Sequence, residues 1–186
     1  MSTLCEELHG KAKAELIGLN YDLLDAIVDL DYETFDELCA DDISCLEPET
    51  NQSVVIGKEF HKYYFDVFGG DKKGVDAQKA KNENMERLRV ATRRPSMLVR
   101  ESSLSSGMNA GTNATTRTNV TMVQPHVQFL GDEDDPTGAV ISYVKLTQQT
   151  APGKPPVTMQ QSESRVWEKR DGHWVNIHFH KSPYKA

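Results

Sequence analysis

No run of apolar residues in this chain approaches the roughly 20 residues that a membrane-spanning helix needs. The stretch from Met1 to Lys11 is polar and acidic, and it lacks the apolar segment of a signal peptide. The chain has three cysteines and no CxxC pair, a pattern typical of free thiols in a reducing compartment. These absences predict a cytoplasmic protein with no membrane partner.

Motifs for nucleotide binding and hydrolysis are also absent. The chain contains no GxGxxG, P-loop, GxSxG or HExxH sequence. Each of these motifs sets phosphate-binding backbone, a nucleophile or metal ligands at a fixed spacing. Without them, we expect no cofactor and no catalysis by the chain itself.

Positive charge is scarce outside one segment. The net charge is −7, yet residues 71–118 hold ten Lys/Arg against five Asp/Glu, a balance of +5. The rest of the chain therefore carries −12. An acidic body of this kind argues against nucleic-acid binding.

The order of expected elements indicates an α+β fold. Apolar residues at helical spacing predict helices in the first part of the chain, together with one early strand that Pro48 ends. Alternating apolar residues predict four strands in the last part, the final two joined by a tight turn at Asp171-Gly172. The expected helices span residues 3–29, 31–38 and 57–68, and the expected strands span 42–49, 119–130, 138–149, 157–170 and 173–181.

A polar segment at about 69–118 separates these two parts. Twelve of the seventeen residues from Ser102 to Thr118 are Ser, Thr, Asn or Gly. A tract of this composition has too few apolar side chains to offset the conformational entropy that it would lose on ordering. We expect a flexible, basic insertion within a single domain of residues 1–186, with a frayed helix over Ala77–Val90. Arg93 stands three residues before Ser96, the spacing of a basophilic kinase site, so Ser96 is a candidate phosphorylation site.

The final hairpin is rich in rings and bases. Strict alternation about its turn predicts a polar-aromatic face of Arg165, Trp167, Trp174, Asn176, His178 and His180, and an apolar face of Val166, Val175, Ile177 and Phe179. His178 and His180 could share a metal, but a closed site needs further ligands. The prediction is a structural hairpin with no metal site.

Several stretches in this order resemble the association (hub) domain of calcium/calmodulin-dependent protein kinase type II. They are LLDAIVDLDYETFDELCADDISCLEPE (23–49), FHKYYFD (60–66), QPHVQF (124–129), YVKLTQ (143–148), TMQQSESRVW (158–167) and RVWEKRDGHWVNIHFHKS (165–182). The resemblance covers about residues 10–68 and 118–183 and omits the insertion.

The resemblance implies a fold and a function. The fold is the cystatin-like cone of nuclear transport factor 2, in which a long N-terminal helix packs in a strongly curved antiparallel sheet. The function is a non-catalytic oligomerisation scaffold. Copies of the domain form two stacked rings, with twelve to fourteen or more subunits, and kinase-bearing subunits are candidate partners.

The resemblance also implies an anion pocket at the mouth of the cone. The matching positions are Lys145, Arg165, Lys181 and His61, where two lysines replace arginines and so lose the fork that grips a carboxylate. A small carboxylate or an acidic peptide is the expected ligand, with Arg165 as its principal anchor. Strict alternation puts Arg165 and Lys181 on opposite faces, so they converge only if a bulge intervenes.

Two alternatives stay open. In the first, Arg165 pairs permanently with an internal carboxylate, Glu163 or Glu47, and the pocket is structural. In the second, the chain is a small-ligand-binding protein or an isomerase- or cyclase-type enzyme of the same superfamily, with His61 or Glu163 as its base.

Overall fold

The computed structural model describes residues 2–51, 53–69, 116–132 and 135–184. Most of the expected insertion, the helix predicted over Ala77–Val90 and the candidate phosphorylation site Ser96 lie outside these residues. No helix in the described ranges is long and apolar enough to cross a membrane.

Three helices lie in the first part of the chain, as the sequence predicts. They are α1 (Ser2–Asp29), α2 (Tyr32–Leu38) and α3 (Glu59–Gly69). Helix α1 ends where Leu30 adopts a left-handed φ of 57°, which lets the Asp31 amide donate to the Ala26 carbonyl at 2.9 Å. Asp31 then caps α2 by accepting from the Thr34 amide at 3.2 Å. The chain thus reverses direction in two residues.

The strands form one six-stranded sheet in the order β2-β1-β6-β5-β4-β3. Strands β3 to β6 are the expected antiparallel meander, and β1 joins it by running parallel to β6. The early strand is shifted from its expected place at 42–49, because Pro48 opens the short helix η1 (Pro48–Thr50). The strands are β1 (Cys39–Leu46), β2 (Val55–Ile56), β3 (Arg117–Gly131), β4 (Pro136–Thr150), β5 (Val157–Arg170) and β6 (His173–Lys181).

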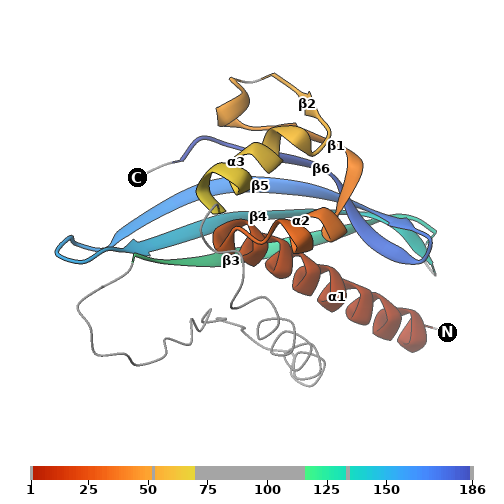
Figure 1. Cartoon of the computed structure of the whole chain (residues 1–186). Coiled ribbons are helices and arrows are strands. Elements are labelled where there is room, and N and C mark those ends of the chain that lie inside the picture. Colours follow the sequence, from red (N-terminus) through yellow and green to blue (C-terminus); the bar gives the residue numbers. More distant parts are fainter. Residues whose placement is uncertain (1, 52, 70–115, 133–134, 185–186) are drawn as a thin grey trace.

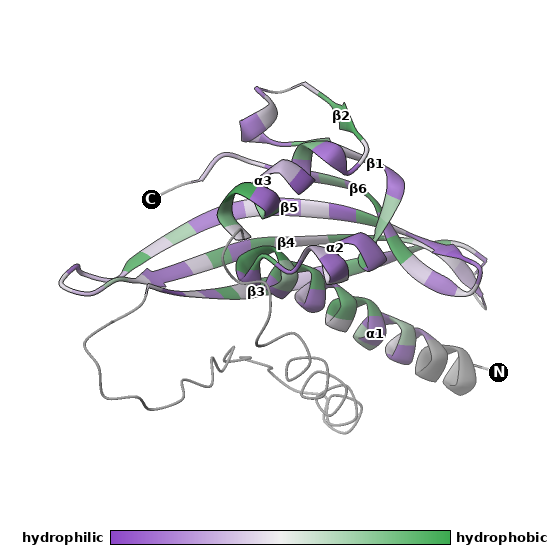
Figure 2. Cartoon of the chain, viewed as in Figure 1, coloured by the Kyte–Doolittle hydropathy of each residue, from purple (hydrophilic) through white to green (hydrophobic). Residues whose placement is uncertain are grey.

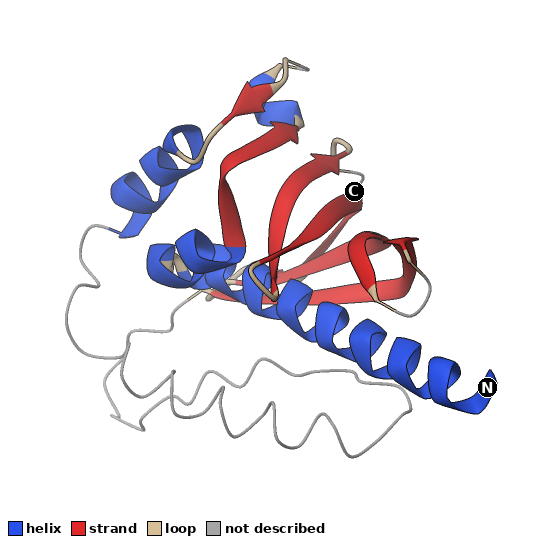
Figure 3. Cartoon of the chain, turned by 90° about the vertical axis from the view of Figure 1, so that its right-hand side faces the viewer, coloured by secondary structure: helices blue, strands red, loops and turns tan. Residues whose placement is uncertain are grey.

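Bulges curve this sheet strongly around the helices (Figures 1 and 3). In β3 the register to β4 shifts between Val123 and His126, where Gln124 has a φ of 51° and precedes a proline. Extra residues of this kind bend a strand and increase its twist. The curved sheet leaves a concave face, which α1 crosses in both views.

The concave face and the helices enclose the core. The apolar residues buried there include Leu16, Leu23, Phe35, Ile43, Ile141 and Trp167. Two polar contacts also tie α1 to the sheet: the Trp167 indole donates to Asn20 Oδ1 at 3.3 Å, and the Met122 amide donates to the Tyr21 hydroxyl at 3.3 Å. Buried polar groups need such partners, so these contacts fix how α1 lies on the sheet.

A bulge in β6 corrects the face assignment of the final hairpin. Trp167 pairs with Asn176, as alternation predicts, but Val166 pairs with His178, so Ile177 is an extra residue. From this point onward β6 changes faces. Phe179 is therefore buried in the core, and the prediction that it shares a face with Val175 and Ile177 is wrong.

Candidate functional site

The site begins with two charged residues of β5. Burial alternates along this strand, so Glu163 and Arg165 both point to the concave face. Their exposed fractions are 3% and 2%. A buried carboxylate and a buried guanidinium are costly unless each is paired, so their partners determine what this site can do.

Three side chains hold the Glu163 carboxylate. The Tyr143 hydroxyl donates to Oε2 at 2.7 Å, and the Arg165 guanidinium donates to the same oxygen at 3.3 Å. Lys145 forms an ion pair with Oε1. Tyr143 and Lys145 are two residues apart on β4, and Glu163 is the cross-strand partner of Tyr143. Strand pairing alone therefore brings these groups together.

Arg165 is enclosed on several sides. Its Nε donates to the Tyr143 hydroxyl at 3.1 Å, and a terminal nitrogen donates to Asn176 Oδ1 at 3.3 Å. The guanidinium carbon lies 4.8 Å from the centre of the Phe179 ring, a cation–π contact. Internal pairing with Glu163, one of the two alternatives for Arg165, is thus the arrangement in this structure.

These contacts fix the charge of Glu163. Burial alone would raise its pKa, but the positive charges of Arg165 and Lys145 outweigh burial and lower the pKa to about 2. Burial lowers the pKa of Lys145, and the charge of Glu163 opposes that change. Glu163 is therefore a stable anion at neutral pH and a weak general base.

The bulge in β6 adds Lys181 to the site. Because of the extra residue, Arg165 pairs with Phe179 and Glu163 pairs with Lys181, so all four lie on one face. Arg165 and Lys181 were expected to share a face only if a bulge intervened, and the bulge in β6 is that irregularity.

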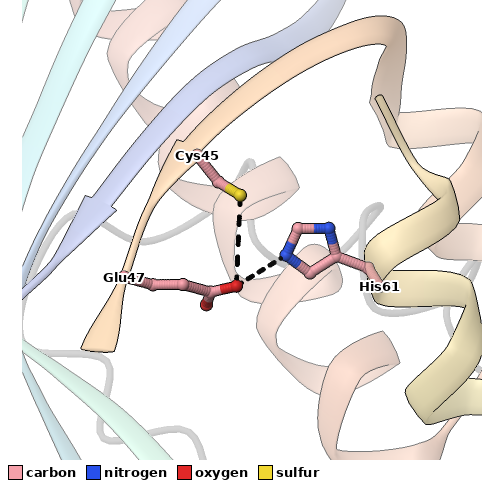
Figure 4. Close-up of side chains that lie close together, drawn as sticks. All are labelled: Cys45, Glu47 and His61. Atoms are coloured by element: carbon pink, nitrogen blue, oxygen red, sulfur yellow. Dashed lines mark hydrogen bonds and ion pairs between the residues drawn. The ribbon is translucent and has the colours of Figure 1, made fainter. Parts of the chain in front are cut away.

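Lys181 connects to a second acidic centre at Glu47. Its Nζ lies 2.6 Å from Glu47 Oε2 and 3.2 Å from Glu49 Oε1. On the other oxygen of Glu47, His61 Nε2 lies at 3.0 Å and the Cys45 thiol at 4.0 Å (Figure 4). Burial alone would raise the pKa of Glu47, but the hydrogen bond from His61 and the charge of Lys181 lower it.

A cavity of about 240 Å³ opens beside Lys145. The end of α1, strands β3 and β4 and the C-terminal segment form its wall: Leu24, Ile27, Val28, Thr118, Val120, Lys145, Thr147, Gln149 and Tyr184. Lys145 Nζ lies 5.9 Å from the centre of the Tyr184 ring. Lys145 is the one charged side chain among these lining residues.

The structure thus gathers the four predicted basic residues on one side of the cone. It also places two acids among them: Glu163 and Glu47 are the candidate internal partners of Arg165, and Glu163 is also the candidate base of the enzyme alternative. Tyr143 and Asn176 were missed as network members, although each lies at a buried position of an alternating strand. The paired His178 and His180 lie apart from this site, and His178 Nδ1 is 2.8 Å from Ser44 Oγ.

Comparison with known families gives one matching family model. It is the calcium/calmodulin dependent protein kinase II association domain, and it matches residues 12–93 and 107–185. Only 94–106 within this span are unmatched, so the family match reaches further into the expected insertion than the stretches 10–68 and 118–183 do.

Individual relatives agree with this match. The chain is 28% identical over 182 residues to rabbit calcium/calmodulin-dependent protein kinase type II subunit delta, covering 97% of this chain and 26% of that protein. The chain therefore spans about a quarter of the length of this curated relative. Among solved structures, the hub homology domain from Chlamydomonas reinhardtii is 32% identical with a TM-score of 0.63, covering 94% of this chain and 99% of that one.

A more distant neighbour confirms the cone-shaped fold. An NTF2-like protein from Cytophaga hutchinsonii is 15% identical with a TM-score of 0.54, covering 91% of this chain and 96% of that one. At this identity the likeness concerns the fold alone.

Proposed function

The chain belongs to the calcium/calmodulin dependent protein kinase II association domain family, and from this membership we propose that it is a scaffold that assembles copies of itself into a closed ring. The scaffold has no catalytic role of its own. Kinase-bearing subunits remain candidate partners. The observation that carries the proposal, beyond membership, is an apolar surface on α3 and β2.

This surface is defined by Val54, Ile56, Tyr63, Val67 and Phe68. Their exposed fractions run from 53% to 74%. Figure 2 shows hydrophobic ribbon at β2 and at the end of α3. Large exposed apolar side chains on an element are typical of surfaces that bind another protein, and a second copy of the chain is the partner that family membership favours.

The native mass of the purified protein tests this proposal. The chain weighs 20.9 kDa, so a particle of twelve subunits would weigh about 250 kDa. We expect light scattering at micromolar concentration to give a single species of that order. A monomer or dimer under these conditions would contradict the scaffold.

The enzyme alternative is less well supported by the geometry. An isomerase or cyclase needs a base with a pKa near the working pH, whereas Glu163 is held as an anion by two cations. His61 is engaged by Glu47. A particle of on the order of two to four subunits would favour this alternative.

We further propose that the cavity beside Lys145 binds small carboxylates or acidic peptide side chains. Lys145 is the ligand contact, because Arg165 is already held by Glu163, Tyr143 and Asn176. Arg165 and Lys181 are each paired with buried or partly buried carboxylates, so Lys145 is the cation that lines the cavity itself. Burial lowers the pKa of Lys145, and an anion in the cavity would offset that cost.

Calorimetric titration with acetate and succinate tests this pocket. We expect saturable binding to the wild type and affinity lower by about tenfold to a hundredfold in Lys145→Met, the loss of one charge-assisted hydrogen bond. Lys154→Met is the matched control, because Lys154 is exposed in the turn after β4. Equal binding by wild type and Lys145→Met would show that the pocket does not use this lysine.

A further inference from the structure

Cys45, Glu47 and His61 form a compact group of three metal-ligating side chains (Figure 4). Among the described residues, they are the group whose ligand atoms approach closely enough to hold an ion, all lying within 4.8 Å of one another. Cys45 and Glu47 are two residues apart at the end of β1, so their side chains share a face, and α3 supplies His61 opposite them.

We propose that this group is a binding site for a single zinc-class transition metal ion, with Cys45 Sγ, His61 Nε2 and Glu47 Oε1 as ligands. Thiolate, imidazole and carboxylate together favour Zn²⁺ or Co²⁺ over the hard cations Mg²⁺ and Ca²⁺. Three protein ligands leave a fourth position for water or an incoming ligand, the arrangement of many zinc sites that bind a small molecule.

The distances fit a tetrahedral ion after small movements. Usual zinc bond lengths and tetrahedral angles require separations of about 3.4 Å between nitrogen and oxygen and about 3.6 Å between sulfur and oxygen. The structure has 3.0 Å from His61 Nε2 to Glu47 Oε1 and 4.0 Å from Cys45 Sγ to the same oxygen. These two pairs are within about 0.4 Å of the required values. The third pair, Cys45 Sγ and the His61 ring nitrogen, lies within 4.8 Å, against about 3.6 Å in a tetrahedral site, so side-chain rotation has to bring the sulfur and the ring closer together.

The surroundings hold the ligands in place. Lys181 binds Glu47 through Oε2, which leaves Oε1 directed at the group, and Lys181 has a second carboxylate partner in Glu49. Such outer partners orient a ligating carboxylate. Aromatic rings enclose His61: Phe35, Phe60 and Phe179 lie with ring centres 5.8, 5.3 and 5.3 Å from its own.

The charges are compatible with a divalent ion. Coordination displaces the thiol proton of Cys45, so thiolate and carboxylate together balance two positive charges. Because Cys45 is fully buried and Glu47 is 4% exposed, the bound ion would be shielded from bulk water on the sheet side. The site rests on these three residues alone and does not depend on ring assembly or on the carboxylate cavity.

Titration with Co²⁺ after removal of metal by a chelator tests the proposal. We expect one Co²⁺ per chain, with the intense visible bands of tetrahedral cobalt and a thiolate-to-cobalt absorption in the near ultraviolet, both abolished by one equivalent of Zn²⁺. Cys45→Ser should remove the thiolate absorption and weaken binding at least tenfold. Cys39→Ser is the control, because Cys39 is equally buried but lies outside the group, and it should behave as the wild type.

A second measurement guards against variants that fail to fold. In the wild type, Zn²⁺ should raise the melting temperature and a chelator should reverse the rise, whereas His61→Ala should show no metal-dependent shift. The absence of a thiolate-to-cobalt band in the wild type would overturn the proposal. So would a band that survives in Cys45→Ser or disappears in Cys39→Ser.

Discussion

The double variant Val67→Asp/Phe68→Asp should fall from a large ring to a species of one or two subunits. Val67 and Phe68 are 53% and 66% exposed at the end of α3, and Phe68 stacks on Tyr64 at a ring distance of 6.3 Å. Burying such a side chain in an interface contributes about 1.5–3 kcal/mol. Two aspartates add the cost of burying unpaired charge, and a closed ring repeats this loss at every copy of the contact.

The fold of the subunit should survive this substitution. Neither side chain belongs to the buried core, so far-ultraviolet circular dichroism should match that of the wild type while light scattering reports the loss of mass. A charge-matched control is Thr150→Asp/Pro155→Asp, two exposed positions at and after the end of β4. A folded Val67→Asp/Phe68→Asp protein that keeps the wild-type mass would exclude this face of α3 from the assembly interface.

Sequence patterns between neighbouring residues were enough to predict most of the helices and strands. Apolar residues at helical spacing predicted the helix over 3–29, which is α1, and Asp171-Gly172 predicted the final hairpin. Both follow from interactions between residues close in sequence. Strand β2 has only two residues, too few to show an alternation, and its pairing with β1 depends on contacts formed in the folded chain.

The β6 bulge shows where alternation ceases to be informative. No glycine or proline marks Ile177, so the local sequence gave no sign that β6 changes faces there. The packing of Phe179 against Arg165 and His61 accompanies the shift. The contact between His61 and Phe179 joins residues far apart in the sequence, so the positions of Phe179 and Lys181 could not be derived from the hairpin alone.

The sequence allowed the basic residues of the site to be predicted, but not how the acidic residues Glu163 and Glu47 are arranged among them. The resemblance supplied Lys145, Arg165, Lys181 and His61, since each position could be matched to a family stretch. Their division into a Glu163 centre and a Glu47 centre follows from cross-strand register and from the placement of α3. Neither the cross-strand register nor the placement of α3 can be read from a short sequence motif.

Arg165→Met should lower the free energy of unfolding by about 3–5 kcal/mol, the usual result of breaking a buried ion pair from one side. Arg165 is 2% exposed, and its removal leaves Glu163 with one cation fewer in the core. Asn176 Oδ1 loses a donor as well. Methionine fills much of the volume of the guanidinium side chain, so the loss reports the polar contacts more than a cavity.

Urea unfolding at one fixed protomer concentration measures this effect, because the stability of an assembled protein depends on that concentration. Lys169→Met is the matched control. It also removes one positive charge from β5, but Lys169 is partly exposed and pairs with the exposed Asp135 at 3.0 Å, so we expect a loss under about 1 kcal/mol. In Arg165→Met/Glu163→Gln a neutral amide replaces the carboxylate, and part of the lost stability should return.

The size of that recovery separates two roles for the network. If the double variant is more stable than Arg165→Met, the guanidinium serves chiefly to neutralise Glu163, and the charges of the site balance internally. If Arg165→Met unfolds no more easily than Lys169→Met, the internal pair contributes little. Arg165 would then be free to exchange Glu163 for a carboxylate entering the cavity, and the ligand contact would extend from Lys145 to Arg165.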